Sequence, residues 1–241
     1  MTESPAPFRS WSDPPVLLTL FGGGGGDAEG YRRAGFRVIG VDIEDHSRAF
    51  ARIGCEFHQM DWQQGLRRFA RLASVVHASP PCQRYSRASA CRPGLAAQYP
   101  DLIAPVRDAL QATGKPFVIE NVEGAPLIDP VMLCGSMFAL QAEFPSHGLV
   151  GLQRHRLFES NVPLEAPAGC RHELPALRVF GHGRPGNSAL TGPGYAQAAR
   201  DAMGGIWWMT RDQLTEAIPP AYAEHVGLQI AATLTGEARA A

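Results

Sequence analysis

The sequence is poor in lysine and in long apolar runs. Of the 22 basic residues in this chain of 241, only Lys115 is a lysine, and the formal net charge is −1. That balance excludes a protein that holds nucleic acid by global positive charge alone. The longest apolar stretches, 14–21 and 116–119, are far shorter than the roughly 20 residues that cross a bilayer. We therefore expect a soluble protein with no membrane partner.

The chain also has little that indicates export. Residues 1–15 carry Pro, Ser, Asp and Glu, where a secretory leader has a basic start and an apolar middle. The five cysteines are scattered and odd in number, which is typical of reduced thiols rather than of a disulfide framework. We expect a cytoplasmic protein. No obligate protein partner is indicated, and we expect a monomer.

Positive charge is nevertheless concentrated locally. Residues 62–100 contain no Asp or Glu but six arginines: Arg67, Arg68, Arg71, Arg84, Arg87 and Arg92. This segment could face a polyanion, or its arginines could simply be solvated. Charge alone leaves both interpretations open.

The N-terminal two thirds of the chain alternate between apolar runs and helical spacing. The first run, 16–21, ends in five glycines, as a buried parallel strand does before a tight turn. Strands are predicted over 16–21, 36–43, 56–59, 74–78 and 117–120, and helices over 27–34, 47–53, 63–72 and 102–112. The fold class is therefore α/β, with an open, mostly parallel, doubly wound sheet.

The composition of the chain changes after residue 157, where prolines become frequent and residues 181–194 are rich in glycine. Helical spacing resumes over 210–217 and 221–234, the latter after Pro219-Pro220. We divide the chain into a catalytic, cofactor-binding domain over 12–160, an irregular insert over 161–206 and a helical return to the sheet over 207–241.

The residues just after the predicted strands form a coherent set, at the sheet edge where open α/β folds bind ligands. They are Phe21 with the glycine run, Asp42, Asp61, residues 79–83 and Glu120-Asn121. Glycines permit close backbone approach, and a carboxylate that ends the second strand can accept both hydroxyls of a ribose. The pattern favours an adenosine-containing cofactor, although the glycine run alone could be a plain tight turn.

Cys82 has the features of a nucleophile. Pro80 and Pro81 stiffen the loop that presents it, and Arg84 and Arg87 are close enough in sequence to lower the pKa of its thiol. Glu120 ends the next strand, where a carboxyl can hold or deliver a proton. By contrast, Cys55, Cys91 and Cys134 are expected to be inert.

Four blocks in order resemble the DNA cytosine-5 methyltransferases. They are Leu20-Phe21 with the glycines, Pro80-Pro81-Cys82-Gln83 with Ser86, Glu120-Asn121-Val122 and Arg154-His155-Arg156; Ile218-Pro219-Pro220 is similar to the last motif of that family. The segments 76–82 and 133–138 look especially like the short members from actinobacterial phages. The chain departs from the family pattern at Thr19, Gly22, Leu152 and Glu216.

The resemblance implies a Rossmann-like domain that uses S-adenosyl-L-methionine to methylate C5 of a cytosine flipped out of DNA. It implies that Cys82 adds to C6 of the base, that Glu120 hydrogen-bonds to N3 or protonates it, and that Arg154 and Arg156 stabilise the developing charge. The cofactor would be held by Phe21, Gly23, Gly25, Asp42, Ile43, Asp61, Trp62 and Pro80. The substrate would be held by Gln83, Arg84, Ser86 and Asn121.

Two alternatives remain open. The small insert is compatible with a pyrimidine C5 transferase acting on RNA or a free nucleotide, and a catalytically silent nucleic-acid-binding relative is the other. If the insert reads DNA, we expect Arg171, Arg178 and Arg184 to contact phosphates. The resemblance places the protein in the cytoplasm of a bacterial or phage-infected cell.

Three further groups are expected to be structural. Cys170, His172 and His182 have irregular spacing and offer only three ligands, so we predict solvated loop residues and no metal. Trp207 and Trp208 are predicted core anchors. His77 is predicted to be a packed structural histidine.

Overall fold

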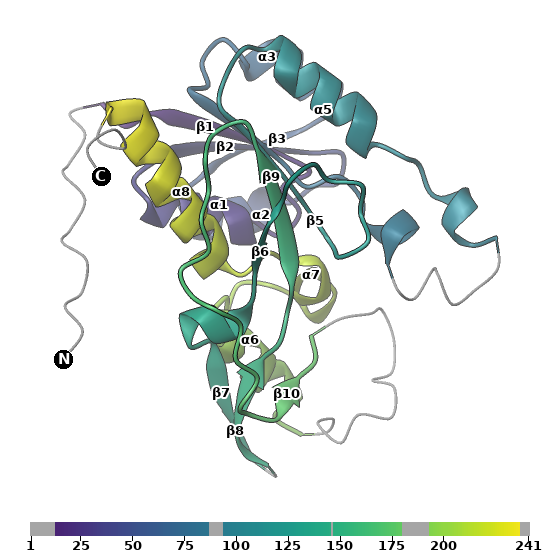
Figure 1. Cartoon of the computed structure of the whole chain (residues 1–241), viewed down its shortest axis with the longest axis vertical. Coiled ribbons are helices and arrows are strands. Elements are labelled where there is room, and N and C mark those ends of the chain that lie inside the picture. The colour runs from purple at the N-terminus through teal and green to yellow at the C-terminus, as the bar shows by residue number, and fades with distance from the viewer. Residues whose placement is uncertain (1–12, 87–93, 146, 180–192, 237–241) are drawn as a thin grey trace.

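The computed structural model describes residues 13–86, 94–145, 147–179 and 193–236. A seven-stranded sheet with the order β3-β2-β1-β4-β5-β9-β6 forms its centre (Figure 1). The strands are β1 (Val16–Leu20), β2 (Arg37–Asp42), β3 (Glu56–Gln59), β4 (Val75–Ala78), β5 (Phe117–Asn121), β6 (Val131–Leu133) and β9 (Arg156–Ser160). Arg87, Cys91, Arg92, His182 and Arg184 lie outside the described residues.

The first five strands of this order run parallel, as predicted. Strand β9 is antiparallel to both β5 and β6. The doubly wound, mostly parallel sheet is therefore confirmed. The two strands β9 and β6 were not predicted, because Arg156–Ser160 is largely polar in sequence and Val131–Leu133 is only three residues long.

Helices cover both faces of the sheet (Figure 1). One face packs against α1 (Gly26–Arg33), α2 (Ser47–Arg52) and α8 (Pro220–Thr235), and the other against α3 (Trp62–Phe69) and α5 (Ile103–Ala112). Successive side chains of β1 point to opposite faces of the sheet. Leu17 packs in the core shared with α1, α2 and α8, and Leu18 packs in the core shared with α3 and α5. The C-terminal helix thus packs against the main sheet.

Close packing of α1 against the start of α8 requires glycine. A Cβ atom on Gly30 would lie 2.3 Å from the carbonyl oxygen of Pro220 and 2.7 Å from Cβ of Ala223. On Gly26 it would lie 2.3 Å from the carbonyl oxygen of Ile218. This approach holds the segment before α8 against the glycine turn that ends β1.

A second, three-stranded sheet lies beside the main one. It has the order β10-β8-β7 and consists of β7 (Gln141–Phe144), β8 (Gly148–Leu152) and β10 (Ala176–Leu177). Helix α6 (Tyr195–Ala202) shares a buried core with these strands and with α7 (Arg211–Glu216). The predicted boundary at residue 160 cuts across this sheet, because β7 and β8 precede it and β10 follows it.

Short 3₁₀ helices complete the described chain: η1 (Gln83–Tyr85), η2 (Ala96–Gln98) and η3 (Gly135–Phe138). Within the described ranges, every helix is too short or too polar to span a bilayer.

Candidate active site

A pocket opens at the carboxyl ends of β1, β2, β4 and β5. Nine residues singled out from the sequence line it: Phe21, Gly23, Asp42, Ile43, Pro80, Cys82, Gln83, Glu120 and Arg156. It is also lined by Gly22, Gly24, Gly26, Asp27, Glu44, His46, Ser79, Pro81, Glu216, Ala217 and Ile218. The glycine turn, the cysteine loop and the glutamate therefore share one cavity.

Asp42 is fixed at the end of β2 by two main-chain donors. The amide of Gly23 donates to its Oδ2 at 2.9 Å, and the amide of Glu44 donates to its Oδ1 at 3.0 Å. Each carboxylate oxygen has a further lone pair. The half-buried carboxylate can thus accept a pair of ligand hydroxyl groups.

Three residues predicted to hold a cofactor lie outside the pocket lining. Gly25 has φ of 77° and caps the start of α1. Asp61 accepts a hydrogen bond from the amide of Gln63 and caps α3. Trp62 packs on Phe21 with the ring centroids 6.0 Å apart, so these residues shape the surroundings of the pocket.

Cys82 lies at the start of η1, directly after the two prolines. The side-chain amide of Asn121 donates to the carbonyl oxygen of Pro80 at 2.8 Å, which ties the loop to the end of β5. Burial raises the pKa of the Cys82 thiol, and Glu120 raises it further, whereas Arg156 and Arg154 lower it. The two arginines that precede and begin β9 therefore favour the thiolate form of Cys82, whereas burial and Glu120 disfavour it.

Arg84 does not serve the thiol, contrary to the prediction. Its guanidinium donates to the carbonyl oxygens of Tyr99 (3.0 Å) and Ala96 (3.4 Å) and lies 3.5 Å from the carboxylate of Asp101. These contacts hold η1 against the segment around η2. None of these three partners lines the pocket, so Arg84 positions the cysteine loop.

Of the other predicted substrate residues, Gln83 has an open polar group. Within the described part of the chain, its buried Oε1 atom accepts no hydrogen bond. Ser86 donates to the carbonyl oxygen of Gln83 at 3.3 Å and is not among the lining residues. Gln83 can therefore contact a ligand directly, whereas Ser86 and Asn121 support the loop.

Glu120 and Arg156 form an ion pair inside the pocket. Arg156 Nε lies 3.0 Å from Glu120 Oε1, without the geometry of a hydrogen bond, so this buried oxygen keeps a free acceptor position among the described groups. Antiparallel pairing of Asn121 with Leu157 brings the two side chains together. Burial raises the pKa of Glu120, and Arg156 and Arg154 oppose that rise.

Arg154 lies behind the pocket rather than in its wall. It donates to the carbonyl oxygens of Val179 and of Thr215, the latter at 2.7 Å, and its own carbonyl accepts from the hydroxyl of Tyr222 at 2.6 Å. Burial lowers its pKa to about 9, and the neighbouring Arg156 contributes to the decrease. It acts on the site through its charge and by fixing the chain.

Comparison with known proteins gives a structural match but no sequence match. No family model matches the chain, and no curated protein matches it. The Dnmt2 methyltransferase of S. pombe superposes with a TM-score of 0.56 at 12% identity, covering 92% of this chain and 99% of that one. The fold is that of the S-adenosylmethionine-dependent methyltransferases.

Two other solved structures have lower similarity. A DNMT2 mutant from Spodoptera frugiperda gives a TM-score of 0.38 at 18% identity, covering 67% of this chain and 54% of that one. The Entamoeba histolytica methyltransferase EhMeth gives 0.45 at 15% identity, with coverages of 72% and 62%. The resemblance to the short phage enzymes stays a prediction.

On this methyltransferase fold, the sequence analysis missed Asp27 as a pocket residue. It is buried at the start of α1, and the hydroxyl of Thr19 donates to its carboxylate. Burial raises the pKa of Asp27 to about 6. Its place directly after the glycine run, at a helix N-terminus, was the available signal.

The segment before α8 supplies three further missed lining residues, Glu216, Ala217 and Ile218, and the segment after β2 supplies Glu44 and His46. The resemblance of Ile218-Pro219-Pro220 to a family motif pointed to this stretch without assigning it to the pocket. The close approach of Ile218 to Gly26 explains why it lies there.

The predicted structural groups have mixed outcomes. His77 is fully buried between Tyr31 (2.9 Å from its Nδ1) and Ser79 (2.8 Å from its Nε2), and burial lowers its pKa to about 3, which confirms the prediction. Trp208 is the anchor expected, because its indole donates to the carbonyl oxygen of Gly24 at 3.0 Å. Trp207 is not, since 59% of it is exposed.

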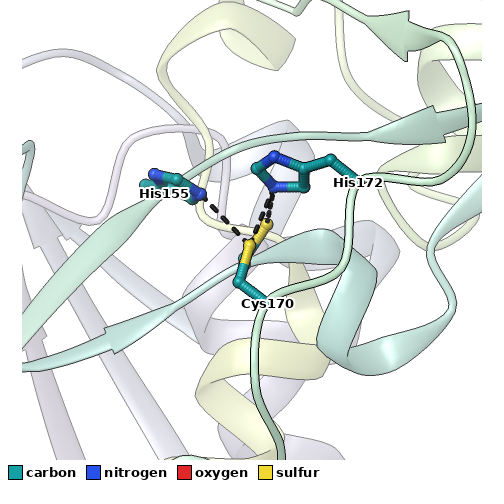
Figure 2. A group of neighbouring side chains, drawn as sticks. His155, Cys170 and His172 are labelled. Atoms are coloured by element: carbon teal, nitrogen blue, oxygen red, sulfur yellow. Dashed lines mark hydrogen bonds between the residues drawn. The ribbon is translucent and has the colours of Figure 1, made fainter.

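Outside the pocket, two of the supposed loop residues have unexpected neighbours. Cys170 and His172 lie beside Cys134 and His155, and the four potential ligand atoms are all within 4.8 Å of one another. Figure 2 shows three of these residues, His155, Cys170 and His172. Neither Cys134 nor His155 was considered as a ligand from the sequence. The prediction that no metal binds this chain therefore rested on an incomplete ligand set.

Proposed function

We propose that this protein transfers a methyl group from S-adenosyl-L-methionine to C5 of cytosine in DNA, with Cys82 as the covalent nucleophile. One observation carries the proposal: Cys82, Glu120 and Arg156 line the same cavity as the glycine turn and Asp42. A nucleophile, a proton donor and a fixed positive charge thereby lie beside a site suited to a nucleoside.

The cavity fits the cofactor in shape and chemistry. Gly22, Gly23 and Gly24 leave the main chain open to a ligand, and the Asp42 carboxylate, held by two amides, suits the two ribose hydroxyls. Phe21 and Ile43 offer apolar surface to the adenine, and 71% of Ile43 is exposed. When bound, S-adenosyl-L-methionine supplies an electrophilic methyl group.

Cys82 would begin the reaction by forming a bond between its sulfur and C6 of the base. The attacking form is the thiolate, and burial opposes its formation. The positive charge of Arg156 offsets part of this cost, and the rigid loop between Pro80 and η1 fixes the direction of attack.

Glu120 would move the compensating proton. As sulfur adds to C6, the electron pair of the C5–C6 double bond shifts toward N3, which takes a proton from the carboxyl of Glu120. Because burial raises the pKa of this carboxyl, its neutral, donating form persists to higher pH. Once C5 has gained a methyl group, its proton would pass to solvent water as the C5–C6 double bond re-forms and the Cys82 thiolate leaves. N3 then returns its proton to the Glu120 carboxylate.

The substrate class follows from the resemblance of the four sequence blocks, and it defines what must be tested. A cytosine in duplex DNA must leave the stack before Cys82 can reach C6, at a cost of a few kcal/mol. The second sheet and its insert are small, which favours RNA or a free nucleotide as the second candidate substrate.

The test is incubation with methyl-labelled S-adenosyl-L-methionine and, separately, duplex DNA, single-stranded DNA, RNA and cytidine nucleotides, followed by nucleoside mass spectrometry. We expect labelled 5-methyl-2′-deoxycytidine from DNA. Cys82→Ser should abolish transfer while cofactor binding, measured by calorimetry, stays within about two-fold. Label only in RNA or nucleotide would overturn the DNA assignment, and equal transfer by Cys82→Ser would overturn the covalent route.

A further inference from the structure

A cluster of two cysteines and two histidines lies outside the pocket and has no part in the proposed reaction. Cys134 follows β6, His155 lies between the two site arginines, and Cys170 and His172 belong to the predicted insert. In Figure 2 the side chains of His155, Cys170 and His172 point toward one another. Residues far apart in the chain thus direct soft ligand atoms to one point.

The distances within the cluster are those of ligands around one small ion. Sγ of Cys170 lies 2.8 Å from Nε2 of His172 and 3.4 Å from Nε2 of His155, and Sγ of Cys134 lies 3.3 Å from Nε2 of His172. Tetrahedral zinc with ordinary bond lengths keeps its sulfur and nitrogen ligands roughly 3.5 Å apart. Small adjustments would therefore complete the coordination.

Surrounding groups orient the ligands as they do at metal sites. Nδ1 of His155 lies 3.2 Å from Oε1 of Glu123, which directs Nε2 toward Cys170; a carboxylate behind a ligating histidine is typical of zinc proteins. The hydroxyl of Ser136 lies 3.4 Å from Sγ of Cys134 and 3.5 Å from Sγ of Cys170. It can donate a hydrogen bond to a thiolate.

The position of the cluster in the fold indicates a structural role for such an ion. Residues 161–175, all of them described, contain neither helix nor strand, so this segment has few main-chain hydrogen bonds to hold it. Cys170 and His172 connect it to the end of β6, and His155 connects both to the stretch that carries Arg154 and Arg156. Four protein ligands leave no open position, as expected of a structural site.

We propose that Cys134, His155, Cys170 and His172 form a structural zinc site that fastens the irregular insert to the edge of the main sheet. Two thiolates and two neutral imidazoles are a ligand set that favours Zn²⁺. Binding releases the two thiol protons. The site is independent of the proposed methyl transfer, and either can fail without the other.

The first test is the metal content of untagged protein, purified with a thiol-free reductant and without chelator, by elemental mass spectrometry. We expect about one zinc per chain, and less than one fifth of that in the Cys134→Ser/Cys170→Ser double variant. Cys55→Ser and His58→Gln are the matched controls and should keep the metal, because both residues lie outside the cluster.

A second measurement needs no variant. Wild-type protein produced with Co²⁺ in place of zinc should show intense visible d–d absorption and near-ultraviolet thiolate-to-cobalt charge transfer, both signs of tetrahedral coordination with sulfur. Wild-type protein that takes up neither metal after full reduction would overturn the proposal. So would zinc that remains at full stoichiometry in the double variant.

Discussion

At the scale of single residues, Arg156 and Arg154 oppose the rise in the pKa of the Cys82 thiol. Burial opposes ionisation of Cys82, and the largest effect in favour of its thiolate comes from Arg156, which also pairs with Glu120. The positive charge that favours the thiolate therefore comes from residues more than 70 positions away in the chain, rather than from the neighbouring Arg84 that the sequence favoured.

Replacing Arg156 should make the thiol harder to ionise. In Arg156→Gln we expect the pH midpoint for alkylation of Cys82 by iodoacetamide to rise by about one unit or more, since an opposite charge close to a thiol favours its thiolate. Peptide mass spectrometry would follow Cys82 separately from the other thiols. Arg37→Gln, at the far end of β2, serves as the control, and a midpoint equal in Arg156→Gln and wild type would remove Arg156 from this role.

Asp27 gives a second pH dependence, in stability. Its pKa in the folded protein is about 6, above the ordinary value of 3.8. Between about pH 4 and 6 the folded state holds a proton that the unfolded state has released, so Asp27 makes stability fall as pH rises. Asp27→Asn has no carboxyl to titrate at this position, so its stability does not fall for this reason. The free energy of unfolding of Asp27→Asn minus that of wild type should therefore increase by about 1 to 3 kcal/mol as the pH rises from about 4 to 6.

Urea unfolding at several pH values would measure the difference between Asp27→Asn and wild type. Other titrating groups act equally in both proteins and cancel. A difference that stays constant from pH 4 to 7 would contradict an elevated pKa for Asp27.

At the scale of elements, the contact between α1 and α8 holds the pocket-lining residues just before α8, Glu216 to Ile218, against the glycine turn. Gly30→Ala would place a methyl group 2.3 Å from the carbonyl oxygen of Pro220. We expect it to lower the free energy of unfolding by about 1 to 3 kcal/mol, the usual cost of overpacking. Gly169→Ala, where nothing lies within 4 Å of the added Cβ, is the control; equal stability of the two variants would show that α1 can move away at no cost.

The same elements show how far sequence reasoning extends. Strands such as Val16–Leu20 and Phe117–Asn121 were predictable because buried parallel strands are largely apolar. The ends of β2, β4 and β5 placed Asp42, Cys82 and Glu120 at one edge of the sheet. Strand β9 was missed because its sequence, RLFES, alternates weakly, and without β9 the meeting of Arg156 with Glu120 could not be foreseen.

The cluster of Cys134, His155, Cys170 and His172 was missed for a different reason. Its ligands come from three separated segments, with only Cys170 and His172 close in sequence. Metal-site motifs are recognised by compact pairs, whereas here tertiary structure brings Cys134 and His155 to the remaining pair. No spacing in the sequence encodes that meeting.

At the scale of the whole molecule, a chain with net charge of −1 needs local charge to hold DNA. Both Arg171, in the irregular segment between Cys170 and His172, and Arg178, directly after β10, are exposed. We expect Arg171→Ala/Arg178→Ala to weaken DNA binding for all sequences and to reduce the slope of log K against log salt by about 1 to 2. Arg37→Ala is the control, and an unchanged slope in the double variant would mean that this surface does not contact phosphate.

The central claim is that Cys82 attacks C6 of cytosine, and trapping of the adduct tests it most directly. In 5-fluoro-2′-deoxycytidine, fluorine replaces the hydrogen at C5, so C5 has no proton to lose after methylation. Release of Cys82 requires that loss, so the protein should stay bonded to DNA that contains this base. We predict a cofactor-dependent covalent protein–DNA complex with the attachment at Cys82, formed by wild type and by Cys55→Ser but not by Cys82→Ser. A complex attached at another residue, or no complex under conditions in which wild type methylates ordinary cytosine, would contradict the account.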